Sequence, residues 1–168
     1  MIIVRDMLVS DCDAIASIHV RGWQTAYQGI MEQSFLDALN VKQRGERWRQ
    51  NLAAGNCPIN LLAEADGKVL AFGGGGHNRT LDVVPEVTGE LWALYTDPQC
   101  WGSGAGTALF KEFSHRIGHS FCIWVATENK IGRKFYEKMG ARLHIASKLE
   151  EVGGTAVPHV AYTYQETK

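Results

Sequence analysis

The stretch Asp97–Gly106, DPQCWGSGAG, has glycine at three alternating positions and is followed at once by TALFKEF, a run with the composition of a helix. We call residues 97–106 the glycine loop. Glycine leaves main-chain N–H groups uncovered, and the amino end of a helix carries partial positive charge, so a turn of this kind can bind an anion, most often a phosphate. Because short glycine patterns also occur in plain flexible turns, the surrounding sequence has to decide between the two interpretations.

Length and composition favour one globular domain spanning residues 1–168. The chain is 45% hydrophobic, and its 17 basic and 18 acidic residues leave a net charge of −1, which predicts neither a nucleic-acid partner nor a membrane-surface partner. The first residues reach Arg5 and Asp6 before any apolar run is long enough for a signal peptide, and no later run is long enough to cross a membrane. These features predict a soluble, cytoplasmic protein.

The cysteines and histidines do not form a recognisable metal-binding or redox pattern. Cys12, Cys57, Cys100 and Cys122 are far apart and include no C-x-x-C pair, and the six histidines show no H-E-x-x-H spacing. We expect the cysteines to be buried apolar side chains with reduced thiols, and we expect no metal site.

Hydrophobic periodicity predicts an α/β order of elements. A strand at residues 1–6 precedes a first helix, whose start has the capping-box spacing of Ser10 and Asp13, and a second helical region follows at 34–53 with a break near Asn40. Asp66-Gly67 predicts a hairpin within residues 60–76. Then come a strand at 90–97, a helix at 107–118, a strand at 120–127, a helix at 131–139 and a closing strand pair, 142–151 with 157–164. This order predicts a mixed, mostly antiparallel sheet flanked by helices.

Two well-known phosphate-binding folds fit this order poorly. A nucleotide-binding P-loop would need Gly-Lys-Ser/Thr after the turn, and the chain has none. A dinucleotide-binding fold would begin with a strand–helix–strand unit, whereas hairpin strands come first here.

At this point the chain resembles the GCN5-related N-acetyltransferase (GNAT) superfamily. LWALYTDPQCWGSGAGTALF looks like its central motif, in which a strand, a phosphate-binding turn and a helix hold acetyl-coenzyme A. WVATENKIGRKFYEKMGA is similar to its second motif, with matches at Asn129, Phe135, Tyr136 and Gly140, and HVRGWQTAYQGI looks like the opening helices of a bacterial branch. The three segments cover most of the chain in the expected order, and the resemblance implies a GNAT-like fold.

The resemblance also implies a set of cofactor-binding residues. The main chain of the strand end would pair with the pantetheine arm, and the glycine loop would bind the diphosphate. The set is Leu94, Tyr95, Thr96, Trp101, Gly102, Ser103, Gly104, Ala105, Gly106, Thr107, Asn129 and Tyr136.

Two positions depart from the superfamily pattern. Trp101 stands where Gln or Arg is usual, while the alternative register, which uses Gln99, places the glutamine two residues early. We favour the Trp101 register, in which binding depends on main-chain donors rather than on that side chain. Ala141 replaces the aromatic residue that usually follows the glycine, which we interpret as a packing change.

Acetyl transfer to an amine requires a group that removes a proton, because an aliphatic ammonium has a pKa of ~10.4. By resemblance to the histone-acetylating branch, Glu90 occupies the position of the base; the alternative is a solvated carboxylate at a strand start. The resemblance makes Tyr136 the general acid that protonates the leaving thiolate, with an aromatic packed on the sheet as the alternative. Trp23, Tyr27, His77 and Trp92 are candidates for lining the acceptor pocket, although each could equally belong to the core or rim.

These features together predict an acetyl-CoA-dependent N-acetyltransferase that acts without a metal. The acceptor would be a primary amine of a small molecule or peptide, and transfer would be direct, in a ternary complex. Two alternatives remain: N-acyl or N-succinyl transfer on the same fold, and a non-catalytic module that binds coenzyme A and regulates a partner. The sequence leaves the identity of the amine and the oligomeric state, including a homodimer, open.

Overall fold

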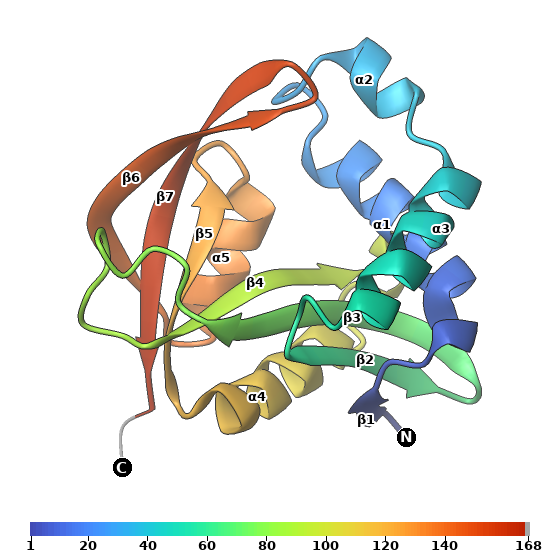
Figure 1. Ribbon diagram of the computed structural model, residues 1–168, viewed down its shortest axis with the longest axis horizontal. Helices are drawn as coiled ribbons and strands as arrows, with labels where there is room; N and C mark the ends of the chain where they lie inside the picture. The colour runs from blue at the N-terminus through green and yellow to red at the C-terminus, as the bar shows by residue number, and fades with distance from the viewer. Residues whose placement is uncertain (167–168) are drawn as a thin grey trace.

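The computed structural model describes residues 1–166, which form one seven-stranded sheet with helices on both faces (Figure 1). The strand order is β1-β2-β3-β4-β5-β7-β6, and every neighbouring pair is antiparallel except β4 and β5, which are parallel. This confirms the predicted mixed, mostly antiparallel sheet. The strands are β1 Ile3–Asp6, β2 Ile59–Ala65, β3 Lys68–His77, β4 Gly89–Thr96, β5 Ser120–Ala126, β6 Arg142–Val152 and β7 Thr155–Gln165.

The helices agree with the predicted pattern except at the start of the first one. They are α1 Cys12–Ala26, α2 Gln33–Asp37, α3 Val41–Ala54, α4 Ala105–Ile117 and α5 Lys130–Lys138. The predicted break near Asn40 is confirmed, because the Asn40 side chain accepts the Gln43 N–H at 3.0 Å and caps α3. The predicted capping box is wrong: a short 3₁₀ turn precedes α1, and Asp11 accepts the Leu8 N–H at 2.8 Å there.

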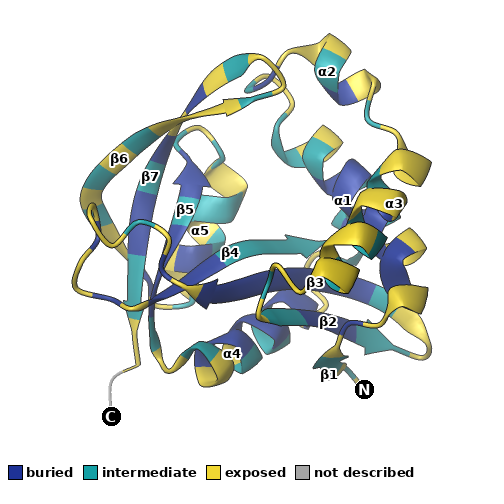
Figure 2. Ribbon diagram, viewed as in Figure 1, coloured by how far each residue is buried: buried dark blue, intermediate teal, exposed yellow. Residues whose placement is uncertain are grey.

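Alternate residues of the strands bury the two faces of the sheet against different helices. Leu61 of β2 packs in the cluster that contains Phe113 of α4, whereas its neighbour Leu62 packs with Ile15 and Ile18 of α1. β3 is buried from Leu70 to Gly76, whereas β4 is buried only from Gly89 to Leu91 and is intermediate from Trp92 onward (Figure 2). We call the α1 side the upper face and the α4 side the lower face. Because successive side chains of a strand point to opposite faces, alternate residues of β2 pack against α1 above the sheet and α4 below it.

A bulge in β4 marks the point where the sheet opens. Ala93 pairs with Gly74 and Leu91 pairs with Gly75, so Trp92 is an extra residue on β4. The parallel pairing of β4 with β5 ends at the same place, after the pair Leu91 and Ile123. A bulge bends and twists its strand, and from Trp92 onward β4 pairs only with β3. The edge of β4 that faces β5 is therefore free of strand partners over its last five residues.

Within residues 1–166, none of the helices is both long enough and apolar enough to cross a membrane.

Candidate active site

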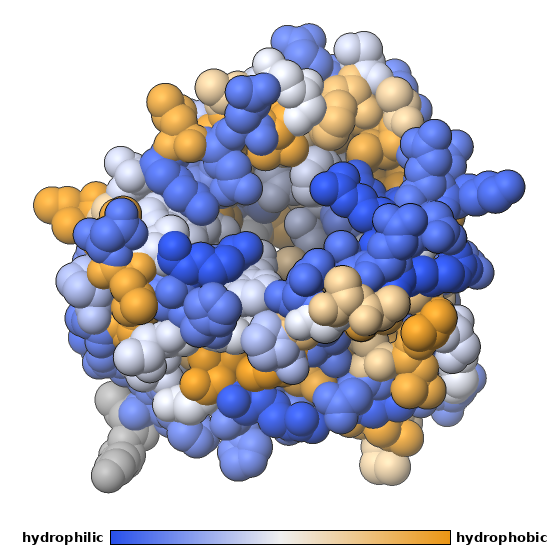
Figure 3. Space-filling model, in the orientation of Figure 1, coloured by the Kyte–Doolittle hydropathy of each residue, from blue (hydrophilic) through white to orange (hydrophobic). Residues whose placement is uncertain are grey.

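A cavity of about 490 Å³ lies where β4 and β5 diverge. Residues from α1, β4, the glycine loop, β5, α5, β6 and β7 line it. In the space-filling view the molecule is hollowed near the centre of the face shown, and hydrophilic side chains surround much of the hollow (Figure 3). The cavity thus connects the glycine loop with the upper face of the sheet.

The glycine loop takes a shape that requires glycine at two positions. Gly102 and Gly104 have φ angles of 84° and 91°, in the left-handed region that other residues rarely adopt. Alternate amides of the loop are occupied: the N–H groups of Trp101, Ser103 and Ala105 donate to Pro98 O, Cys100 O and Ser103 Oγ, at 3.4, 3.2 and 3.3 Å.

Four other amides of this region remain available. The N–H groups of Gly102, Gly104, Gly106 and Thr107 have no hydrogen-bond partner anywhere in residues 1–166. Gly106 and Thr107 belong to the first turn of α4, where main-chain N–H groups lack helical partners and the helix dipole is positive. Four uncovered donors at a helix amino end are suited to a diphosphate.

Two contacts fix the loop against its neighbours. Asp97, only 1% exposed, accepts the Gln99 N–H at 3.1 Å and forms an ion pair with Arg21 of α1 at 2.7 Å. Burial on its own raises the pKa of Asp97, but the Arg21 and Gln99 hydrogen bonds outweigh burial and lower it. On the outer side, the Trp101 indole N–H donates to Thr96 O at 3.2 Å, and its half-exposed ring forms part of the cavity wall.

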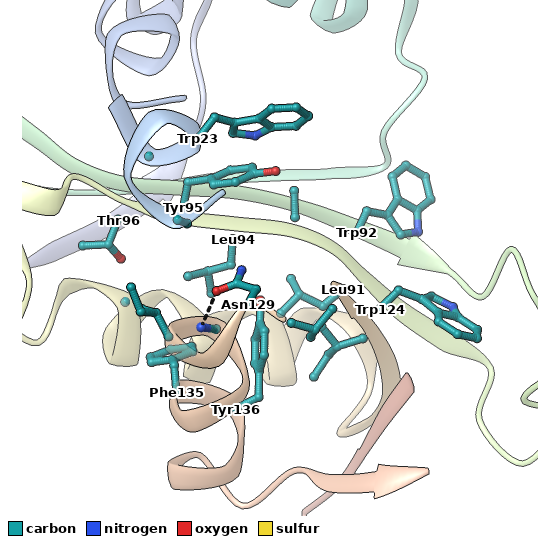
Figure 4. A pocket seen from close by; sticks show the side chains of 18 of the residues that line it. Trp23, Leu91, Trp92, Leu94, Tyr95, Thr96, Trp124, Asn129, Phe135 and Tyr136 are labelled. Atoms are coloured by element: carbon teal, nitrogen blue, oxygen red, sulfur yellow. Dashed lines mark hydrogen bonds between the residues drawn. The ribbon is translucent and has the colours of Figure 1, made fainter. Parts of the chain in front are cut away.

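Asn129 and Tyr136 reach the cavity from α5, below β4 (Figure 4). Asn129 Oδ1 accepts the Gly132 N–H at 2.9 Å and caps the helix, so its remaining capacity toward a ligand is the amide Nδ2. Tyr136 is 8% exposed, and its side chain rises from α5 toward β4. Burial, with a smaller contribution from Tyr95, raises the pKa of Tyr136. Its hydroxyl therefore stays protonated at neutral pH and can act as a donor.

Glu90 is a buried, paired carboxylate, which excludes the solvated alternative. It is 1% exposed, and Arg79 contacts both of its oxygens: the Arg79 main-chain N–H donates to Oε2 at 2.8 Å and Nη2 donates to Oε1. The Arg79 guanidinium also lies 4.5 Å from the centre of the Trp92 ring. Both Glu90 and Arg79 line the cavity.

Three of the four acceptor-pocket candidates line the cavity. Trp23 and Tyr27 come from the end of α1, with ring centres 5.1 Å apart, and Trp92 comes from the bulge of β4. In Figure 4 Trp23 and Tyr95 lie above β4, and Trp92 of β4 and Trp124 of β5 lie toward the right of the view. His77 is exposed and is not among the lining residues; its ring packs edge-on against Trp92, with ring centres 5.7 Å apart.

Strands β5, β6 and β7 form a second wall of the cavity, which was not predicted from the sequence. Lys148 lies 4.7 Å from the centre of the Trp124 ring and 3.2 Å from the Glu150 carboxylate, and His159 lies alongside. The predicted strands carry a weak signal for only one of these residues, because His159 interrupts an apolar run. The loop residue Arg79 carried no such signal.

Comparisons with known proteins agree with this arrangement. The profile of the Acetyltransferase (GNAT) family matches residues 18–141. The uncharacterized N-acetyltransferase YuaI of Bacillus subtilis (strain 168) is 29% identical over 133 residues, which cover 77% of this chain and 74% of that protein.

Two solved structures show the same fold. The PaiA N-acetyltransferase of Thermoplasma acidophilum, solved in complex with coenzyme A, superposes with a TM-score of 0.68 at 18% identity, covering 98% of this chain and 99% of that one. YncA of Salmonella typhimurium, solved with acetyl-CoA, gives a TM-score of 0.64 at 18% identity, covering 98% and 93%. Since the family profile spans most of the chain and includes the glycine loop and α5, the chain belongs to the GNAT acetyltransferase family.

Proposed function

We propose that the protein is an acetyl-CoA-dependent N-acetyltransferase that transfers the acetyl group directly to a primary amine of a small molecule or peptide. The observation that carries the proposal is the continuity of the cavity. The free edge of β4, the four uncovered amides and the buried phenol of Tyr136 all border one space. Acetyl-CoA, when bound there, supplies an activated acetyl group.

The donor half of the cavity fits the chemistry of acetyl-CoA. The amides of Gly102, Gly104, Gly106 and Thr107 would bind the diphosphate. The free edge of β4, residues 92–96, would accept an extended arm as an added strand. The Trp101 ring and Asn129 Nδ2 would border that arm, since both lie on the cavity.

Tyr136 and the free edge of β4 line the same cavity, which supports a role for Tyr136 as the proton donor. Tyr136 would protonate the leaving sulfur, because burial keeps its hydroxyl neutral. Glu90 lies on the upper face, held by Arg79, and is one candidate for the group that receives the proton of the amine. The aromatic side chains of Trp23, Tyr27 and Trp92 would exclude water from the acceptor.

Two measurements test the proposal. Calorimetric titration with coenzyme A and acetyl-CoA should give 1:1 binding, and a thiol-release assay with acetyl-CoA and a panel of amino acids, aliphatic diamines and peptides should identify at least one acceptor. Running the panel with succinyl-CoA separates acetyl transfer from the wider acyl alternative. Binding without turnover of any amine would instead favour the regulatory module, and absence of binding at millimolar coenzyme A would contradict the proposal.

A further inference from the structure

The charged groups that line the acceptor side of the cavity are mostly neutralised by a neighbour. Glu90 is paired with Arg79, and Glu150 is paired with Lys148 at 3.2 Å. Each of these carboxylates therefore already has a cationic partner. His159 differs from these groups, because its second ring nitrogen is free.

The hydrogen bond of His159 fixes its tautomer. Its Nδ1 lies 2.9 Å from Val157 O on the same strand. A carbonyl oxygen only accepts, so Nδ1 carries the hydrogen, and in the neutral ring Nε2 then carries the lone pair. Nε2 makes no hydrogen bond to any group in residues 1–166, and His159 lines the cavity while being 8% exposed. Nε2 is therefore left without a competing hydrogen-bond partner in a residue that lines the cavity.

Strand register places His159 on the acceptor face of the sheet. Directly paired residues share a face, and His159 pairs with Ala126 of β5 and with Lys148 of β6. Ala126 packs in the same apolar cluster as Trp23 and Tyr27, which close the cavity from α1. The register therefore puts His159 on the same face as Lys148, with which it shares the cavity wall.

We propose that His159 is the general base, a role that rests on the proposed function. The acceptor ammonium gives one proton to Nε2, and the resulting amine forms a C–N bond to the acetyl carbon while the C–S bond breaks. Tyr136 gives its proton to the departing sulfur and regains one from the attacking nitrogen. The proton on Nε2 then passes to water, so an ammonium and a thioester yield an amide, a thiol and one proton.

The pH dependence separates this role from a structural one. With the base in place the enzyme uses the ammonium form of the acceptor, so kcat/KM of the wild-type enzyme should stay flat as the pH approaches the pKa of the amine from below. Without the base only the already neutral amine reacts, so kcat/KM should rise about tenfold per pH unit below the amine pKa. The charged and titratable side chains that line the cavity together with His159 are Lys148 and Glu150 on β6, Glu90 and Tyr95 on β4, Arg79 on the β3–β4 loop, Cys100 in the glycine loop, Tyr136 and Lys138 on α5, and Tyr27 at the end of α1; Lys148 is the direct strand partner of His159.

The experiment compares His159→Asn and His159→Gln with the wild-type protein. Asn retains a donor near the position of Nδ1 and so preserves the bond to Val157 O, whereas Gln fills the space toward Nε2 with a group that does not titrate. Both variants should bind coenzyme A as the wild type does in calorimetry. Both should lose about 100-fold or more in kcat/KM at pH 7, and both should show the steep pH profile.

Two further variants complete the test. His115→Asn changes an exposed histidine on α4 outside the cavity and should keep wild-type kinetics. Glu90→Gln removes the competing candidate and should leave the flat region of the profile in place. The steep profile in Glu90→Gln, or its absence in both His159 variants, would overturn the inference.

Two measurements distinguish a failure of the His159 role from a failure of the proposed function. Nitrogen NMR of the wild-type imidazole should show hydrogen on Nδ1, and the opposite tautomer would overturn the inference even if a His159 variant failed to fold. If the wild-type protein neither binds coenzyme A nor acetylates any amine, the proposed function itself fails. Wild-type turnover together with unchanged His159 variants would refute only the role of His159.

Discussion

Tyr136 shows how the surroundings of one residue decide its chemistry. Phe110 and Phe135 lie beside its ring, with ring centres 6.3 and 5.2 Å away, and the hydroxyl end lines the cavity. This apolar surrounding raises the pKa of Tyr136, so the group is a proton donor and not a phenolate at neutral pH. The sequence resemblance suggested the role, and the burial explains why the residue can perform it.

Tyr136→Phe should separate chemistry from binding. The ring and its packing remain, so we expect coenzyme A affinity and thermal stability close to those of the wild type. The proton donor is lost, so kcat should fall about 100-fold or more. Steady-state kinetics and calorimetry on the same preparation check this, and an unchanged kcat would rule Tyr136 out as the acid.

His19 is a buried histidine with a structural role. Its Nδ1 accepts the Trp48 indole N–H at 3.2 Å, and its ring stacks on Tyr95 with ring centres 4.8 Å apart. Burial first, and then the charges of Arg44 and Arg47, lower the pKa of His19 from 6.5 to about 3. The folded protein therefore holds a neutral imidazole that the unfolded chain would protonate below pH 6.5.

This difference predicts a loss of stability in mild acid. Because the folded-state pKa of His19 is depressed, its contribution is fully present above pH 6.5 and declines as the pH falls toward about 3. The slope from this one group is about 1.4 kcal/mol of unfolding free energy per pH unit. Urea unfolding between pH 7 and pH 4 should show it, and His19→Gln should remove that part of the slope. An equal slope in the variant would contradict the neutral assignment.

At the scale of the element, the first turn of α4 allows the role of one main-chain N–H to be tested separately from that of its side chain. The N–H of Thr107 is the third of the helix and has no partner in residues 1–166. Proline is tolerated in the first turn of a helix, because the N–H that it lacks makes no helical bond there. The contribution of a single amide can therefore be removed without removing a helical hydrogen bond.

Thr107→Pro should weaken coenzyme A binding, whereas Thr107→Val, which keeps the amide, should not. A hydrogen bond to a charged group contributes about 1.5–3 kcal/mol, so the proline variant should raise Kd about 10-fold or more. Calorimetric titration of both variants provides the measurement, with circular dichroism to verify that α4 remains. Equal affinities would show that the diphosphate is bound elsewhere.

Glycine is required at Gly73 of β3 for a different reason than in the glycine loop. In β3 the reason is close packing, whereas Gly102 and Gly104 have positive φ angles. A Cβ placed on Gly73 would lie 2.4 Å from Ala93 O and 2.9 Å from the Phe113 ring, because β4 and α4 approach the strand there. On Gly74 the nearest atom would be Cys57 Sγ at 2.9 Å, the end of a side chain that can move.

Gly73→Ala should therefore destabilise the fold by about 1–3 kcal/mol, the usual cost of overpacking a core. Gly74→Ala serves as the matched variant on the same strand and should lose clearly less. Urea titration of the two proteins measures the difference. Similar unfolding midpoints would mean that β4 and α4 yield at Gly73 more easily than the packing suggests.

At the scale of the whole molecule, the sequence predicted the helices and strands better than it predicted how those elements align with one another. The hairpin at Asp66-Gly67, the helix break at Asn40 and the strand–loop–helix unit follow from local signals, and all are present. The bulge at Trp92 has no comparable local signal, since it depends on how β3 and β4 align.

The same limit applies to the cavity. The ion pair of Glu90 with Arg79 joins residues 11 positions apart through a loop, and the wall at Lys148 and His159 exists only because β7 pairs with both β5 and β6. Spacing along the chain does not encode such pairings. The glycine-loop side of the cavity, which is local in sequence, was therefore predictable. On the opposite side Trp23, Tyr27 and Trp92 were predicted as candidates, whereas Arg79, Lys148 and His159 were not.

The open sheet predicts that ligand binding stabilises the entire fold. Only three residue pairs join β4 to β5, so the β1–β4 part and the β5–β7 part share little main-chain pairing. Coenzyme A at 100 times its Kd should add about 2.7 kcal/mol to the unfolding free energy. Differential scanning calorimetry should show one transition that moves upward with coenzyme A, and no movement would argue against binding across the opening.

The positions of the tryptophans make intrinsic fluorescence a probe of the cavity. Of its five tryptophans, Trp23, Trp92, Trp101 and Trp124 border the cavity, and Trp48 lies apart in the contact with His19. The emission spectrum of the unlabelled protein is thus dominated by indoles whose surroundings change when the cavity fills. Trp101, half-exposed in the glycine loop, borders one end of the cavity, and Trp124, which lies against Lys148, borders the other. Replacing one indole at a time by phenylalanine would allow the order of substrate entry to be followed in a stopped-flow fluorimeter.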